Sequence, residues 1–397
     1  MFFKEVFFMG KSSFYRDTWV EVNLDAIYNN VTHIKEIIPE SVEIFAVVKA
    51  NAYGHDYVLV ARTALEAGAT RLAVAFLDEA LVLRRAGITA PILVIGPSPP
   101  RDVNVAAEND VALTVFQKEW VEEAVEIWDS PFPMKFHINF DSGMGRIGIR
   151  ERKELKEFLR SLEDAPFLEL EGIYTHFATA DEVETSYFDK QYNTFLEQLS
   201  WLKAFGVNPT FIHTANSAAT MRFDGITFNA VRIGIAMYGL SPSVEIRPYL
   251  PIKLEPALSL HTTVAHIKRV IKGDRISYNV TYRTKTEEWI ATVPIGYADG
   301  WLRRLQGFEV LVQGKRVPIV GRITMDQCML HLPCEVPLGT KVTLIGQQGD
   351  EYISATEVAE YSNTINYEII ATISFRVPRV FIRHGEVVKV INYLNDI

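Results

Sequence analysis

The chain has 397 residues, of which 48% are hydrophobic and 22% charged, and its formal net charge is -9 at pH 7. This length and composition predict an ordinary folded globular protein with room for two domains. The negative charge argues against binding to nucleic acid or to an anionic membrane surface, because proteins that bind phosphate backbones usually carry a basic face. No run approaches the ~18 apolar residues of a membrane-spanning helix.

The N-terminal stretch and the cysteines exclude further classes. The first ten residues, MFFKEVFFMG, contain only short apolar segments with no small-residue cleavage site after them, so we predict no targeting segment there. Cys328 and Cys334 are the only cysteines, and no histidine pair lies near them. We therefore predict neither a disulfide framework nor a metal site, and free thiols fit a reducing cytoplasm.

From residue 25 to about 240, apolar runs typical of buried strands alternate with amphipathic helical patterns. A leading helix, with Asp25 as its N-cap, places Ile27, Val31, Ile34 and Ile38 on one stripe. A later helix carries six apolar residues at steps of three and four, namely Phe188, Tyr192, Phe195, Leu196, Leu199 and Leu202.

The candidate strands begin near residues 44, 71, 91, 112, 135, 170, 211 and 230. Eight strand and helix alternations predict a parallel (β/α)8 TIM-type barrel rather than a shorter doubly wound sheet. Prolines at 248, 251 and 256 mark a boundary, after which short β-branched runs and turn signals predict a mostly β region with one short helix near ATEVAEYS. We expect a barrel domain over 13–253 and a β-rich C-terminal domain over 254–397.

Polar side chains follow several of the predicted barrel strands. Lys49 ends the first, Arg146 follows the fifth, His176 ends the sixth, residues 215–217 (ANS) end the seventh, and Arg232 lies in the eighth. The carboxyl ends of barrel strands meet at one mouth, so we expect these residues to converge there. Alone, Lys49 could be a strand-end lysine that reaches water. In such a cluster, burial and neighbouring cations would lower its pKa from ~10.4, as a lysine nucleophile requires.

A glycine motif in the same region permits another interpretation. Gly143, Gly145 and Gly148 form a G-x-G-x-x-G after a predicted strand and before a helical pattern, with Glu163 further on. This is the local context of a dinucleotide site. However, the motif follows four strand and helix units, and Arg146 would place a guanidinium where backbone must approach a pyrophosphate. We therefore favour the barrel-mouth interpretation.

Nine blocks in order resemble the bacterial alanine racemases, enzymes that depend on pyridoxal phosphate (PLP). The blocks are AVVKANAYGHD, HINFDSGMGRIG, YTHFATAD, HTANSAA, VRIGIAMYGLSP, ISYNVTY, PIGYADGW, RITMDQ and NYEIIATISFRVPR. The resemblance extends from about residue 15 to the C-terminus. It implies a (β/α)8 barrel that carries PLP and a β-rich C-terminal domain, in agreement with the two regions predicted above.

The resemblance implies that Lys49 binds PLP as an imine and acts as one base, and that Tyr278 is the other. Two bases are needed because a racemase removes the α-proton of alanine from one face of a PLP-stabilised carbanion and returns a proton to the opposite face. By analogy, Lys49 serves D-alanine and Tyr278 serves L-alanine. We expect His176 and Arg232 to give the phenol of Tyr278 hydrogen-bonded, cationic surroundings. From residue type alone, Tyr278 would be a packed strand aromatic.

The resemblance also assigns contacts around PLP and the substrate. Arg232 matches the partner of the pyridine nitrogen, to which it can donate a hydrogen bond but from which it cannot accept a proton; without the resemblance it would be a structural ion-pair residue. The other residues expected to contact PLP are Tyr53, His176, Ser217, Tyr367 and the amides of Gly234 and Ile235. Those expected to contact the substrate are Arg146, the Met325 amide and Tyr297.

Two positions depart from the family pattern. Many members carry a carbamylated lysine that orients the arginine of the GMGR block, whereas this chain has Asn139 there. We expect Arg146 to be held either by the neutral amide of Asn139 or by a small anion such as chloride. Thr324 stands before Met325 where relatives often carry cysteine.

The resemblance further implies a homodimer in which Lys49 of one subunit works with Tyr278 of the other. It implies cytoplasmic production of D-alanine for peptidoglycan. Three alternatives remain open: a racemase of broader specificity that accepts serine, a PLP decarboxylase of the same architecture, and a non-catalytic PLP carrier. A decarboxylase would need acidic residues for a distal amine, and carriers resemble the barrel alone, so the YADG and MDQ blocks and Tyr278 favour the racemase.

Overall fold

The computed structural model describes residues 14–395, so the MFFKEVFFMG stretch lies outside the described residues. The chain forms two compact units. One, here the barrel unit, comprises Ala26–Glu255. The other, here the β unit, combines, among the described residues, 14–25 with 256–395. Each unit has its own core and is described by itself.

The barrel unit is a closed barrel of eight parallel strands, as the sequence predicts. The strands are β2 (Glu43–Val47), β3 (Arg71–Val74), β4 (Ile92–Pro97), β5 (Val111–Thr114), β6 (Met134–Asn139), β7 (Leu168–Tyr174), β8 (Phe211–His213) and β9 (Ala230–Ile233). β2 closes the barrel because it pairs with both β3 and β9, which places Phe45 opposite Arg71 on one side and Arg232 on the other.

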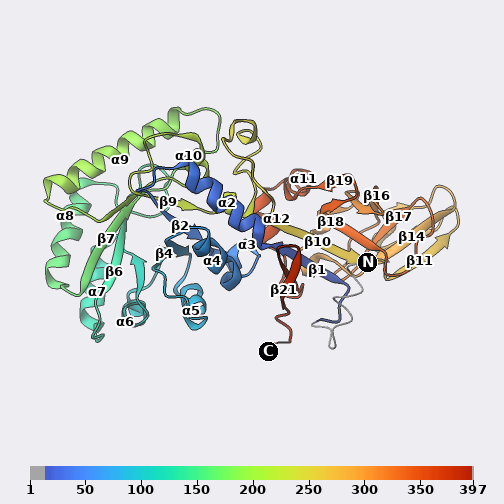
Figure 1. Cartoon of the computed structure of the whole chain (residues 1–397), viewed down its shortest axis with the longest axis horizontal. Helices are drawn as coiled ribbons and strands as arrows, with labels where there is room; N and C mark the ends of the chain where they lie inside the picture. Colours follow the sequence, from blue (N-terminus) through green and yellow to red (C-terminus); the bar gives the residue numbers. More distant parts are fainter. Residues whose placement is uncertain (1–13, 396–397) are drawn as a thin grey trace. The chain divides into compact units, whose positions relative to one another are not determined.

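Helices follow the strands and lie outside the barrel (Figure 1). They are α2 (Leu24–Ile37), α4 (Tyr57–Glu66), α5 (Leu77–Arg85), α6 (Val103–Glu108), α7 (Lys118–Ile127), α8 (Arg152–Ser161), α9 (Ser186–Ala204) and α10 (Ser217–Arg222). The short element α3 (Lys49–Tyr53), directly after β2, is not a right-handed helix, because Ala50, Asn51 and Ala52 have positive φ angles. The apolar stripe predicted for the leading helix is buried. The N-cap prediction was wrong: α2 begins at Leu24, and Asp25 lies in its first turn, where its carboxylate accepts the N–H of His384.

The buried face of α9 differs from the predicted stripe. Phe188, Phe195 and Leu202 are buried, but Leu196 is 40% exposed. Gln191 and Gln198 are buried instead, and their amides bond to loop backbone. Gln191 accepts the N–H of Ala178 and donates to His176 O. Gln198 donates to Asp141 O and Ile149 O. The helix therefore holds two loops at the barrel mouth through side-chain hydrogen bonds, and it also packs against the barrel through its apolar residues.

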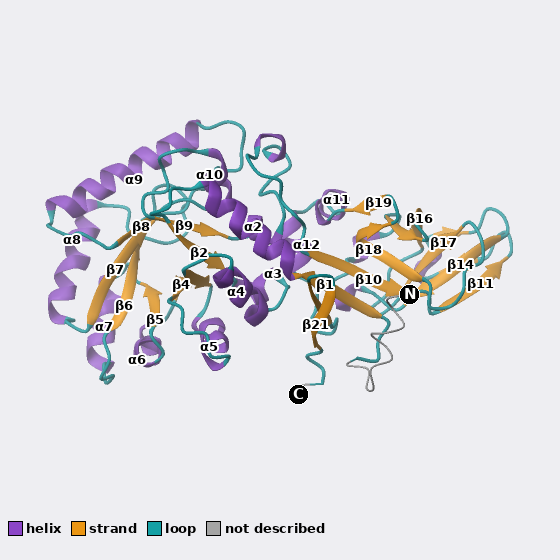
Figure 2. Ribbon diagram, viewed as in Figure 1, coloured by secondary structure: helices purple, strands orange, loops and turns teal. Residues whose placement is uncertain are grey.

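The β unit is built on an 11-stranded sheet in the order β11-β14-β17-β16-β15-β18-β10-β1-β20-β21, with β19 on β18. Figure 2 shows the strands of this unit as orange arrows. Its strands are β1 (Thr18–Asn23), β10 (Leu258–Thr263), β11 (His266–Val270), β14 (Glu288–Val293), β15 (Glu309–Val312), β16 (Lys315–Val320), β17 (Cys328–Leu332), β18 (Lys341–Gln348), β19 (Glu351–Ile353), β20 (Arg379–Arg383) and β21 (Glu386–Ile391). A small separate ribbon pairs β12 (Arg275–Ile276) with β13 (Tyr282–Arg283).

Two features of the β unit were not predicted. β1 inserts between β10 and β20, antiparallel to the first and parallel to the second, and its Val20 and Val22 are fully buried. Besides the predicted helix α11 (Ala355–Tyr361), a second helix, α12 (Asn366–Ala371), follows it.

Both cysteines are free, with Cys328 buried and Cys334 exposed. Across residues 14–395, no helix is both long and apolar enough to cross a membrane.

Candidate active site

Lys49 opens an unusual backbone turn directly after β2. The four residues that follow it have positive φ angles, at 53° for Ala50, 54° for Asn51, 50° for Ala52 and 54° for Tyr53. Residues with a Cβ atom visit this left-handed region only singly as a rule, because it costs about 1–2 kcal/mol each. Four in succession therefore require strong support from their surroundings, and such strain gathers at functional sites.

Packing and hydrogen bonds supply part of that support. Ala52 N donates to Val48 O at 2.9 Å, and Gly54 N donates to Ala50 O at 3.0 Å. The ring of Tyr53 stacks on Tyr238 with centroids 4.6 Å apart. The Tyr238 hydroxyl in turn donates to Val47 O at 2.9 Å, which fastens the turn to the end of β2.

The surroundings of Lys49 lower its pKa. The half-buried amine loses hydration, which is the largest effect, and the nearby Arg146 charge adds to the decrease, while Glu79 opposes it. A lower pKa increases the fraction of neutral amine at neutral pH, and the neutral amine is the form that attacks a carbonyl or accepts a proton. Lys49 therefore has the electrostatic environment that the sequence analysis expected.

Arg232 is a buried cation that is held by neutral groups. Its NH1 donates to His213 Nδ1 at 2.7 Å and to His213 O at 2.9 Å. Its NH2 donates to Thr175 O at 2.7 Å and Thr214 O at 3.1 Å, and lies 3.3 Å from His176 Nδ1. No carboxylate of the described residues pairs with it, and burial lowers its pKa to about 10. A guanidinium in this setting stays charged and favours an electron-rich or anionic ligand.

From Arg232 a chain of hydrogen bonds runs through the barrel interior. His213 Nε2 lies 2.9 Å from His137 Nδ1, and His137 Nε2 lies 2.9 Å from Glu171 Oε2. Burial lowers the pKa of both histidines, so both are neutral. Because Arg232 can only donate, His213 must accept at Nδ1 and carry its proton on Nε2, and the same logic places the proton of His137 on Nε2. Every bond of the chain thus points from Arg232 toward Glu171.

His176 differs from the expectation in one respect. Its pKa is far below the usual value, because burial disfavours the charged ring and Arg232, Arg146 and Lys49 all repel a proton there. From the sequence we expected His176 to add positive charge to the site, but its ring is a neutral hydrogen-bonding group. Lys49 and the two arginines supply the positive charge of the mouth.

A tight loop after β6 carries Arg146. Asp141 Oδ1 accepts the N–H groups of Gly143 and Gly145, and Ile149 N donates back to Asn139 O at 2.9 Å. Gly148, at φ 117°, lies so close to Asn139 that a Cβ there would be 2.3 Å from its Oδ1. The glycine motif therefore shapes this loop. Arg146 is exposed, and within residues 14–395 its guanidinium makes no hydrogen bond or ion pair, so Asn139 does not hold it.

Small groups gather where the phosphate of a cofactor is expected. The Oγ of Ser217 accepts the N–H groups of Gly234 at 2.9 Å and Ala236 at 3.4 Å, which leaves its own proton free to be donated. A Cβ at position 234 would lie 2.6 Å from the Tyr53 hydroxyl, so only glycine lets Tyr53 approach. Ile235 begins a short 3-10 helix (Ile235–Tyr238), where its N–H has no partner within the helix. These donors and the nearby cations fit a phosphate group.

The remaining predicted residues lie in the β unit. Tyr278 is 69% exposed and borders an open pocket of about 330 Å³ together with Ser277, Thr324 and Gln327. Tyr297 and Met325 are 42% and 53% exposed. They are neighbours, because Tyr297 N donates to Thr324 O and Ala298 N donates to Met325 O, each at 3.0 Å. Tyr367 is half-buried in α12.

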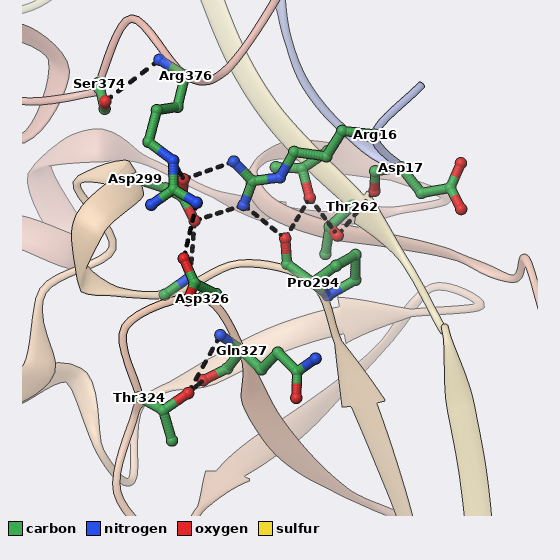
Figure 3. A network of polar contacts seen from close by, with 12 residues as sticks. Arg16, Asp17, Thr262, Pro294, Asp299, Thr324, Asp326, Gln327, Ser374 and Arg376 are labelled. Carbon is green, nitrogen blue, oxygen red and sulfur yellow. Dashed lines mark hydrogen bonds and ion pairs between the residues drawn. The ribbon is translucent and has the colours of Figure 1, made fainter. Parts of the chain in front are cut away.

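A buried carboxylate fastens the turn that carries Tyr297 (Figure 3). The carboxylate of Asp299 accepts hydrogen bonds from both terminal nitrogens of Arg16, each at 2.5 Å, and from the N–H of Gly296 at 2.9 Å. Arg376 lies 3.7 Å from Asp299 and donates to Asp326 at 2.7 Å. Gly296 has no room for a side chain, because a Cβ there would be 2.3 Å from Thr324 O. The YADG and MDQ blocks are thus packed directly together.

Several residues that build the site carried no signal that the sequence analysis used. Asp299, Gln191 and Gln198 are polar residues whose partners lie far along the chain. Glu79 is a buried acid in an otherwise ordinary helix. The only available signal was the seven-residue spacing of the two glutamines, which places both on the inner face of α9.

The fold and these groups define a barrel enzyme with a cationic mouth and a separate β unit that presents tyrosines. Comparison with known proteins agrees. Residues 22–242 match the family model described as alanine racemase, N-terminal domain, and residues 257–381 match alanine racemase, C-terminal domain. The chain belongs to the alanine racemase family, whose members are PLP-dependent isomerases.

Individual relatives cover nearly all of the chain. Alanine racemase of Geobacillus stearothermophilus is 58% identical over 381 residues, covering 96% of this chain and 97% of that protein. A solved structure of alanine racemase from Bacillus anthracis with bound L-Ala-P is 88% identical, covers 97% of this chain and 100% of that chain, and has a TM-score of 0.96. A histidine racemase from Leuconostoc mesenteroides is 33% identical, with a TM-score of 0.85 and coverage of 93% and 99%.

We expect Asp299→Asn to destabilise the β unit by about 2–3 kcal/mol, because it removes the charge that Arg16 requires and turns an amide N–H₂ toward its donors. Unfolding in urea, followed by the fluorescence of Trp301 and its neighbours, measures the loss. The control is Glu287→Gln, which breaks the exposed ion pair with Arg269 and should change stability by less than about 1 kcal/mol. Equal effects of the two substitutions would contradict a supporting role for Asp299.

Proposed function

We propose that this protein interconverts L-alanine and D-alanine with PLP bound at the carboxyl mouth of its barrel. Two features of the barrel unit carry the proposal. The amine of Lys49 has a lowered pKa, and the buried guanidinium of Arg232 has no carboxylate partner among the described residues. Full-length similarity to proteins named alanine racemase supports the choice of substrate. The product D-alanine would supply peptidoglycan, and two free cysteines are consistent with a cytoplasmic location.

The residues at the barrel mouth suit PLP in type. Lys49 would hold the coenzyme covalently, and Arg232 would donate to its ring nitrogen through Nε, which makes no hydrogen bond to any described residue. Ser217, Tyr53, Tyr367 and the amide of Ile235 would bind its phosphate, and the amide of Gly234 would join them by exchanging its bond to Ser217 Oγ for one to the phosphate. When bound, PLP supplies an electron-accepting ring that stabilises negative charge left at the α-carbon of alanine when its proton is removed.

The proposal gives two side chains the task of moving that proton. Lys49 would take the proton from the D face as the neutral amine and return it as the ammonium form, and Tyr278 would take it from the L face as the phenolate and return it as the phenol. Arg232 stays protonated, so it donates to the ring nitrogen without giving it a full positive charge. This limits how far charge spreads into the ring and so disfavours side reactions such as transamination. Tyr297 would cover the entrance.

Incubation of the purified protein with L-alanine should therefore yield D-alanine, and incubation with D-alanine should yield L-alanine, with chiral chromatography as the measurement. Tyr278→Phe should lose at least about 100-fold of this activity, because the phenol proton is essential on one face. Serine, histidine and lysine serve as comparison substrates. Equal turnover of serine would favour the broader racemase, release of carbon dioxide the decarboxylase, and PLP binding without turnover the carrier; any of these would overturn the proposal as stated.

We further propose a homodimer in which each site takes Lys49 from one subunit and Tyr278 from its partner. Inactive Lys49→Ala and Tyr278→Phe proteins, mixed under conditions that allow subunit exchange, should regain activity. With random exchange, half of the dimers are mixed and one of their two sites is intact, so roughly a quarter of native activity is expected. The control is mixing each variant with itself. No recovery despite exchange shown by native mass spectrometry would contradict shared sites.

We also propose that a chloride ion occupies the space between Asn139 and Arg146. The support is the neutral amide at 139, which cannot balance the guanidinium, and the absence of any hydrogen bond to Arg146 from described residues. The anion would orient Arg146 for the carboxylate of alanine, with the Met325 amide as a second contact.

Replacing chloride by gluconate at equal ionic strength should raise the KM for alanine by about two- to tenfold with little change in kcat. Without the anion, the guanidinium of Arg146 would no longer be oriented toward the carboxylate of alanine. Steady-state kinetics in the two salts provide the measurement. In Asn139→Leu, which offers the anion no amide, KM should be high in both salts. An identical KM for the native protein in chloride and gluconate would rule the anion out.

A further inference from the structure

Glu79 connects the Lys49 turn to the rest of the barrel unit. It lies in the first turn of α5, and only 9% of it is exposed. Its Oε1 accepts the N–H of Ala50 at 2.7 Å and the hydroxyl of Tyr57 at 3.0 Å. Its Oε2 accepts the N–H groups of Ala75 at 2.7 Å and Phe76 at 3.3 Å. One carboxylate thus ties together the loops after β2 and β3 and the start of α4.

The bond to Ala50 falls where the backbone needs support. Ala50 directly follows Lys49 and is the first of the four residues with positive φ. The N–H groups of Ala52 and Gly54 bond to Val48 O and Ala50 O, which lie within the same short stretch of chain, so those bonds join the turn to no separate helix. The bond from Ala50 N to Glu79 joins it to a separate element, the helix α5.

We propose that Glu79 is the positioning residue of Lys49: its buried carboxylate holds the N–H of Ala50 and thereby keeps the strained left-handed turn that fixes the start of the Lys49 side chain. The inference about the turn stands on these contacts. Its consequence for catalysis rests on the role proposed for Lys49 above.

Another glutamate in the same unit shows what an ordinary helix-start contact looks like. Glu154, in the first turn of α8, accepts the N–H groups of Arg150 and Glu151 at 2.9 and 3.0 Å through one oxygen, as Glu79 does for Ala75 and Phe76. Glu154 is exposed and has no contact with the Lys49 turn. The two residues therefore share the capping function, and only Glu79 has the second oxygen on Ala50.

The charge of Glu79 matters as well as its geometry. The charged and titratable groups that act on Lys49 or on its neighbour His176 are Arg146, Arg232 and Glu79, and of these only Glu79 is negative. It opposes the decrease in the pKa of Lys49 that burial and Arg146 produce. A neutral residue of the same shape at position 79 would remove that opposition, so the Lys49 pKa would fall further.

The decisive variant is Glu79→Gln, compared with Glu154→Gln in the full-length protein as purified. The glutamine oxygen can accept on one side only, and its N–H₂ faces donors on the other. Hydrogen exchange followed by mass spectrometry should show exchange at Ala50 roughly tenfold faster or more, because a bond to a charged acceptor is lost. Glu154→Gln should leave exchange at Ala50 unchanged and alter only the start of α8.

A second measurement separates positioning from simple packing. Competitive acetylation of the full chain freed of cofactor, measured at Lys49 across pH, reports the pKa of that amine without any racemase assay. In Glu79→Gln the midpoint should move to lower pH, and in Glu154→Gln it should stay at the native value. If Glu79→Gln folds and neither exchange at Ala50 nor the Lys49 midpoint changes, the proposal is wrong, whether or not the protein racemises alanine.

A third variant does not require a Glu79 substitution to fold. Ala50→Gly removes the steric penalty of positive φ, whereas glycine at an ordinary position lowers stability. We expect the thermal midpoint of Ala50→Gly to equal or exceed the native value, and the double variant Ala50→Gly, Glu79→Gln to regain part of the stability lost in Glu79→Gln. A clear decrease for Ala50→Gly, or no recovery in the double variant, would show that the carboxylate does not oppose strain in this turn.

Discussion

A buried guanidinium without a carboxylate beside it is the constraint on which the barrel interior depends. Removing a cation from water costs several kcal/mol, which neutral acceptors must offset. Arg232 obtains three backbone carbonyls and His213 for this purpose, and His176 lies nearby. Because all of these partners are neutral, the charge itself is left uncompensated inside the protein. An anionic or electron-rich ligand at the mouth is the element that would complete the arrangement.

The same constraint determines the protonation of the neighbouring histidines. A guanidinium cannot accept a proton, so the first imidazole must accept, and each following group must donate onward until an anion ends the chain. Glu171 is that anion, and its bonds from His137 and the charge of Arg71 bring its pKa down to about 2 despite burial. His213 is also stacked between Phe45 and Tyr174, with centroids 5.0 and 4.9 Å away. This packing holds the plane of the His213 ring, and the bond from Arg232 to Nδ1 fixes which nitrogen carries the proton.

The sequence predicted what depends on local pattern. Runs of apolar residues mark strands that are buried on both faces, and this was enough to find eight barrel strands and to place Lys49, His176 and Arg232 at their carboxyl ends. Partners that are distant in sequence have no local pattern. β1 pairs with strands more than 200 residues away, and the partner of Asp299 is Arg16. A helix stripe counted from apolar residues also misses Gln191 and Gln198, because their burial depends on hydrogen bonds to loop backbone that the sequence does not show.

The backbone after Lys49 shows a further limit of pattern. Ala50, Asn51, Ala52 and Tyr53 contain no glycine, and nothing in their residue types predicts a left-handed turn. Such a conformation persists only where the surrounding structure imposes it. The stack of Tyr53 on Tyr238 and the carboxylate of Glu79 impose it from two sides, and neither contact is visible until the barrel has closed.

The rigidity of this turn also suits the role proposed for Lys49. A lysine on a flexible loop would sample many positions, whereas one on a braced turn keeps its amine in the buried setting, close to the Arg146 charge, that lowers its pKa.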